Sequence, residues 1–389
     1  MSWDLSKPLP GDETALRRLR RAWWVWWLAG LGALAAGAAL LSKELGLGLA
    51  GWFGVNLLAL GGVMGFVWSL LGRHRRTTDG PVLAVLGPGN HLTILRGVLI
   101  AQLPGYLLFP WPGGWLAWLP ALTYGTVQAA DYLDGYLARR ANLTTPLGER
   151  LDIEFDGLGL MLATALAVHY GQLPAVYFFT VGIARYLFLA VGWWVQRTGR
   201  PTRPLPPSAT RRGLAGVVME LGVAALWPIA PASMMTLAGV LVGVPVLVGF
   251  VRDTLVYVGA LAPEAPRYRR LRDQAVRFAS RIAPPFLRAA LLLLLGPVLV
   301  ARWAATDLRL IPLLLETLFL GMIVLGLAGR AGAAGMVVVF GLELAFGGVS
   351  PEGLAAWGLA VAIYLAGTGA GSLWQPELVL VTRRAGERR

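Results

Sequence analysis

The chain has 389 residues, of which 56% are hydrophobic and 14% are charged. This composition is too apolar for a soluble globular protein, and the chain is far too long for a single membrane anchor. It contains no cysteine, which excludes disulfides, thiolate metal sites and cysteine nucleophiles. The formal net charge of +13 fits a nucleic-acid binder in principle. Its distribution between the apolar runs points to membrane topology instead, and we expect no nucleic-acid partner.

Apolar runs of transmembrane length begin directly after an N-terminal arginine cluster. The first run follows at 22–41 and opens with four tryptophans, which predict an interfacial aromatic belt rather than a ligand platform. It lacks a small-residue cleavage site, so we expect a retained helix and not a cleaved signal. The next runs lie at 49–71, 90–109, 113–133, 152–169, 173–195, 213–229 and 235–257.

A basic stretch at 267–288 separates these runs from four more. Its apolar residues have the spacing of an amphipathic helix, which favours a helix lying on anionic lipid over a cover for a catalytic site (Tyr268, Leu271, Val276, Phe278 and Ile282). The last runs lie at 288–301, 310–328, 331–347 and 353–371. The sequence therefore predicts an all-α integral membrane protein with about ten transmembrane helices.

The positive charges are divided very unevenly between the two sides of these spans. Of the 34 Lys and Arg, three lie in one set of alternate loops (Lys43, Arg302 and Arg309), four lie within the apolar runs (Arg96, Arg185, Arg252 and Arg288), and the other 27 lie on the opposite side. By the positive-inside rule, both termini are expected to be cytoplasmic. We expect the cytoplasmic membrane of a prokaryote as the location.

Four aspartates fall within the 26 residues from Asp131 to Asp156. Asp131 and Asp134 are three residues apart, and Asp152 and Asp156 are four apart, so each pair shares one face of a helix. A carboxylate inside a bilayer is costly, by roughly 2.5–3.5 kcal/mol on insertion scales, and usually functional. Clustered carboxylates suit hard divalent ions, which predicts Mg²⁺, with Mn²⁺ as the alternative. The competing interpretation is an acidic surface loop that Arg139, Arg140 and Arg150 neutralise.

The pattern Asp-x2-Asp-Gly-x2-Ala-Arg-x8-Gly-x3-Asp-x3-Asp resembles the signature of the CDP-alcohol phosphotransferase family. All eight fixed positions are met at the family's spacing (Asp131, Asp134, Gly135, Ala138, Arg139, Gly148, Asp152 and Asp156). A match of this length is far more specific than a lone glycine motif. The resemblance covers about residues 88–260.

The resemblance implies a role for each of these residues. Asp131, Asp134 and Asp152 would hold two Mg²⁺ ions, and Asp156 would also ligate and would take the proton of the acceptor hydroxyl. The run Asn90-His-Leu-Thr93-Ile-Leu-Arg96 resembles the family's segment that holds the CDP group, although Asn90 is also a plausible helix cap. The nucleotide and diphosphate site is completed by Asp131, Gly135, Ala138, Arg139 and Gly148, of which Gly148 would leave room for the cytidine or its ribose.

The implied reaction transfers the phosphatidyl group of CDP-diacylglycerol to a small polar alcohol and releases CMP, at the cytoplasmic face. A basic rim predicts a phosphorylated acceptor such as glycerol 3-phosphate or inositol phosphate, although positive-inside bias alone also fills this loop with arginine (Arg185, Arg203, Ser208, Arg211 and Arg212). Phosphatidylglycerophosphate synthases carry a Gly-Lys-x-Lys-Thr-like run near here. This chain has Arg211-Arg212-Gly213 instead, so the acceptor stays open.

Three alternatives remain. A choline- or ethanolamine-type enzyme would take a soluble CDP-alcohol and a lipid acceptor. A transporter would use the acids as a cation or substrate site, but it is expected to show repeated halves with broken helices. A metal-dependent phosphatase fits the arginine and glycine placement less well.

The predicted organisation has four parts, in chain order. Residues 1–80 hold two accessory helices, 81–262 the six-helix core, 263–287 the basic linker, and 288–389 a four-helix accessory domain that resembles DoxX-type membrane domains. Three acids lie inside apolar runs, where they either mark a polar pathway or are paired within the bundle (Glu220, Glu316 and Glu343). Membrane lipids are the expected surroundings, and homodimer formation is left open.

Overall fold

The computed structural model describes residues 12–76, 80–141, 143–205, 208–305 and 310–376. Every regular element in these ranges is a helix, as predicted, and no strand occurs among them. The first eleven residues, Arg309 and the C-terminal arginines lie outside the described part. The chain divides into two compact units, Met1–Arg185 with Met219–Pro228, and Tyr186–Val218 with Ile229–Arg389. This division passes through the expected 81–262 core, and the domain bounds stay predictions.

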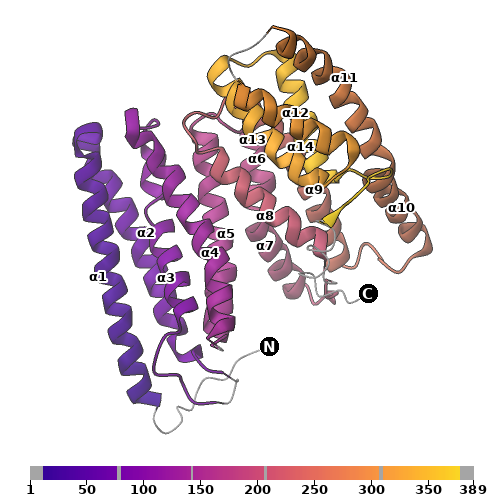
Figure 1. Ribbon diagram of the computed structural model, residues 1–389. Helices are drawn as coiled ribbons and strands as arrows, with labels where there is room; N and C mark the ends of the chain where they lie inside the picture. The colour runs from indigo at the N-terminus through magenta and orange to yellow at the C-terminus, as the bar shows by residue number, and fades with distance from the viewer. Residues whose placement is uncertain (1–11, 77–79, 142, 206–207, 306–309, 377–389) are drawn as a thin grey trace. The chain divides into compact units, whose positions relative to one another are not determined.

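The first unit is a bundle in which α3 is the central helix. Figure 1 shows α1 to α5 side by side, and α3 contacts α1, α2, α4 and α5. Short 3-10 helices lie between some of these helices. The segment η2 (Leu71–Arg73) directly extends α2, and η3 (Pro104–Leu108) follows α3. The helices are α1 (Asp12–Leu45), α2 (Leu49–Leu70), α3 (Pro88–Ile100), α4 (Leu119–Arg140), α5 (Pro146–His169), and α6 (Ala175–Tyr177) with η5 (Phe178–Gly182).

The second unit contains the C-terminal helices. In it α14 contacts α9, α11 and α13, and α12 packs on α11 and α13. The basic helix α10 has no buried residue and continues through η6 into α11. The helices are α7 (Ala184–Arg197), α9 (Ala232–Tyr257), α10 (Pro266–Arg277), η6 (Phe278–Ile282), α11 (Ala283–Ala304), α12 (Leu310–Leu325), α13 (Gly329–Gly347) and α14 (Pro351–Ala366), while α8 (Ala209–Ala224) is divided between the units.

Two of the three intramembrane acids are ion-paired inside the second unit. The Arg302 Nη1 lies 2.9 Å from an oxygen of Glu316 and 3.1 Å from an oxygen of Glu343. The Glu316 side chain is 2% exposed. Since a buried charge without a partner is strongly destabilising, the pairing explains how this bundle carries both acids.

The helices have the length and apolar surface of membrane spans. Six described helices are long and apolar enough to cross a bilayer, or seven if the bent pair Ala175–Gly182 and Ala184–Arg197 is one span. Two shorter apolar helices, α12 and α14, accompany them. Large apolar side chains such as Leu293 and Phe346 are exposed, as lipid-facing residues are. The chain is therefore an all-α integral membrane protein. The sequence shows twelve apolar runs and predicts about ten transmembrane helices, and this number of spans stays a prediction.

The connection that leads into α3 is held by a buried histidine. His74 Nε2 lies 2.9 Å from the carbonyl oxygen of Val85, and its Nδ1 lies 3.3 Å from the Asn90 amide nitrogen. A carbonyl only accepts, so Nε2 carries the proton and Nδ1 accepts from Asn90. Burial lowers the pKa of His74 below 6.5, although the bond to Val85 opposes this. The neutral ring therefore orients Asn90 at the start of α3.

We expect the stability of the protein to fall as the pH drops below about 6.5, because the unfolded chain then binds a proton at His74 that the folded chain resists. The contribution is present above the unfolded pKa and is lost on acidification. Thermal unfolding in detergent between pH 5 and 8 measures it. His74→Gln should flatten part of this pH dependence, while His169→Gln, at an exposed histidine, should leave it unchanged. Parallel curves for the wild type and His74→Gln would contradict this assignment.

Candidate active site

One buried arginine of α3 binds all four aspartates. The Arg96 side chain is 0% exposed. Its Nη1 lies 2.7 Å from Asp131, 3.0 Å from Asp134 and 2.6 Å from Asp152, and its Nη2 bonds to Asp156. The sequence predicted that Arg96 binds the diphosphate. That contact stays a prediction, and in this structure the guanidinium joins the carboxylates of α4 to those of α5.

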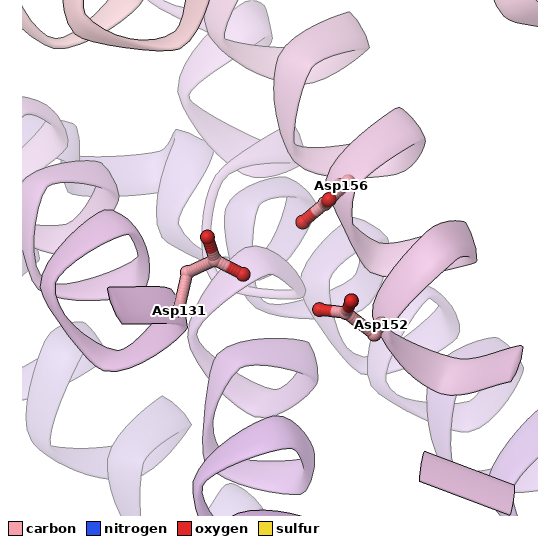
Figure 2. Close-up of side chains that lie close together, drawn as sticks. All are labelled: Asp131, Asp152 and Asp156. Carbon is pink, nitrogen blue, oxygen red and sulfur yellow. The ribbon is translucent and has the colours of Figure 1, made fainter. Parts of the chain in front are cut away.

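The four aspartates differ in how far they reach solvent. The Asp134 side chain is 8% exposed and accepts a further hydrogen bond from the Thr93 hydroxyl at 3.0 Å. The other three are 29–44% exposed. Figure 2 shows Asp131 on one helix facing Asp152 and Asp156 on the next. Asp134 is thus the inner aspartate. Asp131, Asp152 and Asp156 are the outer three, and each is partly open to solvent.

The outer three aspartates have the arrangement of a metal site. One carboxylate oxygen from each of Asp131, Asp152 and Asp156 can be chosen so that all three lie within 4.8 Å of one another. Four carboxylates and one guanidinium leave a formal charge of −3 in a partly buried place, which favours bound cations. An all-oxygen donor set suits Mg²⁺ or Mn²⁺. The donors present therefore fit a divalent ion, whereas Asp134, predicted to be a ligand, lies outside the group of three.

Small residues allow α3 to approach its neighbours closely enough for Arg96 to reach them. A Cβ atom on Gly89 would lie 2.7 Å from the Cβ of Ala138 and 2.8 Å from the backbone oxygen of Asp134. A Cβ on Gly97 would lie 2.6 Å from the Phe155 ring. Small residues at a helix contact serve this purpose in membrane proteins, because backbones can then approach closely.

The start of α5 is fixed by a capping threonine that also contacts α3. Thr145 precedes Pro146, the first helical residue, and its hydroxyl accepts from the Gly148 amide at 3.3 Å. The Asn90 amide donates to the same hydroxyl at 3.4 Å. A Cβ on Gly148 would lie 2.5 Å from the Asn90 oxygen. Here Gly148 makes room for Asn90, while its predicted contact with the cytidine or ribose stays a prediction.

A pocket with a volume of about 520 Å³ adjoins the aspartates. It brings together six of the eight residues predicted to bind nucleotide and diphosphate, while Arg96 and Asp131 do not line it. Asp134 and Asp152 form part of its wall next to the carboxylate cluster. The six predicted residues are Asn90, Thr93, Gly135, Ala138, Arg139 and Gly148.

Sequence reasoning missed several residues around this pocket. Arg76, Thr144, Thr145 and Glu149 also line it. The basic cluster that contains Arg76 was interpreted only as a topology signal. The Thr145-Pro146 pair could have been used to predict the start of α5, since threonine before proline is typical of a helix start. Nothing local in the sequence marks Arg76 as a pocket residue.

The predicted acceptor residues lie in two places. Arg185 is in the first unit, where its guanidinium lies 2.9 Å from Glu154 on α5, an acid between Asp152 and Asp156 that sequence reasoning missed. The other four belong to the second unit, so their part in acceptor binding stays a prediction. Of these, Arg211 lies 3.4 Å from Asp253, and the full set is Arg203, Ser208, Arg211 and Arg212.

Comparison with known proteins agrees with this geometry. Residues 88–251 match the family described as CDP-alcohol phosphatidyltransferase, a family of transferases. The resemblance found in the signature is therefore confirmed over nearly the stretch expected. The DoxX-like resemblance of the last helices stays a prediction. No solved structure matches the chain.

Curated relatives cover part of the same region. The chain is 37% identical over 117 residues to the CDP-diacylglycerol–glycerol-3-phosphate 3-phosphatidyltransferase of Pseudomonas fluorescens, which is 30% of this chain and 58% of that protein. It is 33% identical over 82 residues to cholinephosphotransferase 1 of Xenopus laevis, 20% of each chain. The human cholinephosphotransferase 1 is 32% identical over 88 residues, 22% of each chain. The chain thus spans between a fifth and three fifths of these relatives.

We expect Gly89→Ala to destabilise the site by about 1–3 kcal/mol, because the added methyl group must push α3 away from α4. The matched control is Gly65→Ala in α2, where a Cβ meets nothing within 4 Å. Denaturation of both variants in detergent measures the difference. If Gly89→Ala unfolds like Gly65→Ala, the close contact between α3 and α4 is not a constraint on this site.

Proposed function

Residues 88–251 belong to the CDP-alcohol phosphatidyltransferase family, and on that premise we propose that the chain transfers the phosphatidyl group of CDP-diacylglycerol to the hydroxyl of a small polar alcohol. The observation that carries this proposal is the grouping of Asp131, Asp152 and Asp156 within 4.8 Å beside the pocket. Phosphoryl transfer depends mainly on positioning and charge stabilisation. The pocket would position the donor, and cations held by the three carboxylates would stabilise the charge.

The donor would bind across the pocket and the aspartates. Arg139 and Arg76 are the cations lining the pocket, and arginine is well suited to charge-assisted bonds with diphosphate oxygens. Two divalent ions held by Asp131, Asp152 and Asp156, with Asp134 behind them, would neutralise the diphosphate and make CMP a better leaving group. Mg²⁺ is the expected ion, with Mn²⁺ as a substitute.

The acceptor hydroxyl oxygen then bonds to the β-phosphorus, and the bond between that phosphorus and the oxygen bridging to the α-phosphate breaks. CMP leaves with the electron pair of that bond. Asp156 takes the hydroxyl proton, a role for which it must be within hydrogen-bond reach of the acceptor. No covalent intermediate with the protein is needed, because one displacement accounts for both products.

Two observations support the proposed acceptor class. The relative from Pseudomonas fluorescens is named for glycerol 3-phosphate, and Arg185 lies beside α5 through its bond to Glu154. A guanidinium near the site favours an acceptor that carries phosphate, of the glycerol 3-phosphate or inositol phosphate type.

A second candidate reaction uses a soluble CDP-alcohol as the donor and a lipid as the acceptor. The similarity to cholinephosphotransferases favours a soluble CDP-alcohol that reacts with a lipid hydroxyl at the same aspartates. In both cases we place the active site at the cytoplasmic face, with both termini cytoplasmic, because 27 of the 34 basic residues lie on that side of the expected spans.

The test is CMP release by the purified chain in detergent with Mg²⁺. The donors are CDP-diacylglycerol and CDP-choline, and the acceptors are glycerol 3-phosphate, inositol phosphate, serine, inositol and diacylglycerol. We expect release from CDP-diacylglycerol that depends on a phosphorylated acceptor. Asp156→Asn should lower it about 10²–10⁴-fold, as loss of a general base does.

Asp273→Asn is the control, since it makes the same chemical change at an exposed acid of α10. Release from CDP-choline with diacylglycerol instead would establish the second candidate. No CMP from any pair, in protein that keeps its melting transition, would overturn the transferase assignment. Metal-dependent flux into liposomes would then be the sign of a transporter.

A further inference from the structure

A buried acid of α1 lies next to the segment that carries Arg76 into the pocket. Asp12 is the first residue of α1, and its side chain is 1% exposed. One of its oxygens accepts from the Arg75 guanidinium at 2.9 Å, and the other accepts from the backbone amide of Val82 at 2.8 Å. Arg75 directly precedes Arg76, which lines the pocket beside the aspartates. A buried ion pair is therefore one residue away from the pocket wall.

Asp12 joins two limbs of the connection that leads into α3, which are residues 74–76 and 80–85. Arg75 in the first limb and Val82 in the second form an antiparallel backbone bridge. Asp12 bonds to the side chain of the one and to the backbone of the other. Two hydrogen bonds from a single buried carboxylate thus hold the limbs together beside α1.

The Arg75 guanidinium is bound at each of its three nitrogen atoms. Its Nη2 donates to Asp12, its Nη1 donates to the Gly80 carbonyl oxygen at 2.6 Å, and its Nε donates to the Gly72 carbonyl oxygen at 2.9 Å. Because the guanidinium is a planar, rigid group, three such bonds define the orientation of the Arg75 side chain. They also define the backbone from which the neighbouring Arg76 side chain extends.

Helix α1 is itself fixed to α2 and α3. The Trp23 indole donates to the Met64 carbonyl oxygen at 2.7 Å, and the Trp26 indole donates to Nδ1 of His91 at 3.0 Å. These tryptophans follow Asp12 by 11 and 14 residues, which is about three and about four helical turns, so all three lie on one face of α1. The position of Asp12 is therefore set by contacts with α3, a helix that lines the pocket.

From these contacts we propose that Asp12 is a positioning residue of the donor site. Through Arg75 it holds the first limb so that Arg76 is presented to the pocket, where the Arg76 guanidinium would bind a diphosphate oxygen of the donor. A cation that is held in place beforehand loses less conformational freedom when the donor binds. This inference rests on the proposed function, since it takes the pocket as the place of the donor's diphosphate.

The test is equilibrium binding of short-chain CDP-diacylglycerol to the purified full chain in detergent with Mg²⁺, a measurement that needs no turnover. The variants are Asp12→Asn, Arg76→Gln and the two combined, with Arg75→Gln as a second way to break the same ion pair. Glu13→Gln is the matched control, because it neutralises the adjacent, exposed acid in the first turn of α1. The melting transition shows whether each variant is folded.

We expect Arg76→Gln to raise the Kd about tenfold, as loss of a charge-assisted bond does, and Asp12→Asn to raise it about fivefold. The direction of the second change is informative, because removing a negative charge by itself would strengthen the binding of an anionic donor. The combined variant should bind no more than about twofold more weakly than Arg76→Gln, since residues that act through one another are not additive. Glu13→Gln should not weaken binding.

Wild-type affinity in folded Asp12→Asn or in Arg76→Gln would overturn the inference. So would independent effects, in which the two increases in Kd multiply in the combined variant. If Asp12→Asn does not fold, the same comparison made with Arg75→Gln decides the question. Donor binding without CMP release would contradict the proposed function alone, because the variants would still decide the inference, whereas a wild type that binds no donor would overturn the inference.

Discussion

The first unit depends on a buried guanidinium that binds four carboxylates. Arg96 is fully buried, and removing a partner from a buried charge is strongly destabilising, so α4 and α5 must present their aspartates to it. Asp131 and Asp134 come from one helix and Asp152 and Asp156 from the other. The spacing of three helices is thus set by one side chain, and Gly89 and Gly97 supply the room.

The same interaction separates the roles of the aspartates. Asp134 is the least exposed and is bonded to Thr93 as well as Arg96, so it serves to fix α3 against α4. Asp131, Asp152 and Asp156 keep open sides that face one another, as Figure 2 shows. A charge of −3 remains around a single cation, and this residual charge is the physical reason to expect divalent ions there.

Much of this site could be predicted from sequence because its signals are local. The intervals of three and four residues place each aspartate pair on one helix face, and both helices are present. Asn90, Thr93, Gly135, Ala138 and Gly148 gather at one pocket, as the resemblance implied. Helix type and the exposed amphipathic α10 also follow from periodicity alone.

What could not be predicted arises between helices. No interval in the sequence shows that Arg96 binds the aspartates, that Glu154 holds Arg185, or that Gly148 accommodates Asn90. Arg76 was interpreted as part of a topology signal because its cluster also obeys the positive-inside rule. Similarly, Glu316 and Glu343 gave no sign of their shared partner, Arg302, which lies on another helix.

The most direct test of the account is Mn²⁺ binding by the purified chain, followed by electron paramagnetic resonance in detergent. The account predicts that the wild type and the control Asp273→Asn bind Mn²⁺, and that Asp131→Asn, with its melting transition retained, loses most of this binding. If Asp131→Asn binds as much Mn²⁺ as the wild type, the aspartates around Arg96 are a structural ion-pair network and not a metal site.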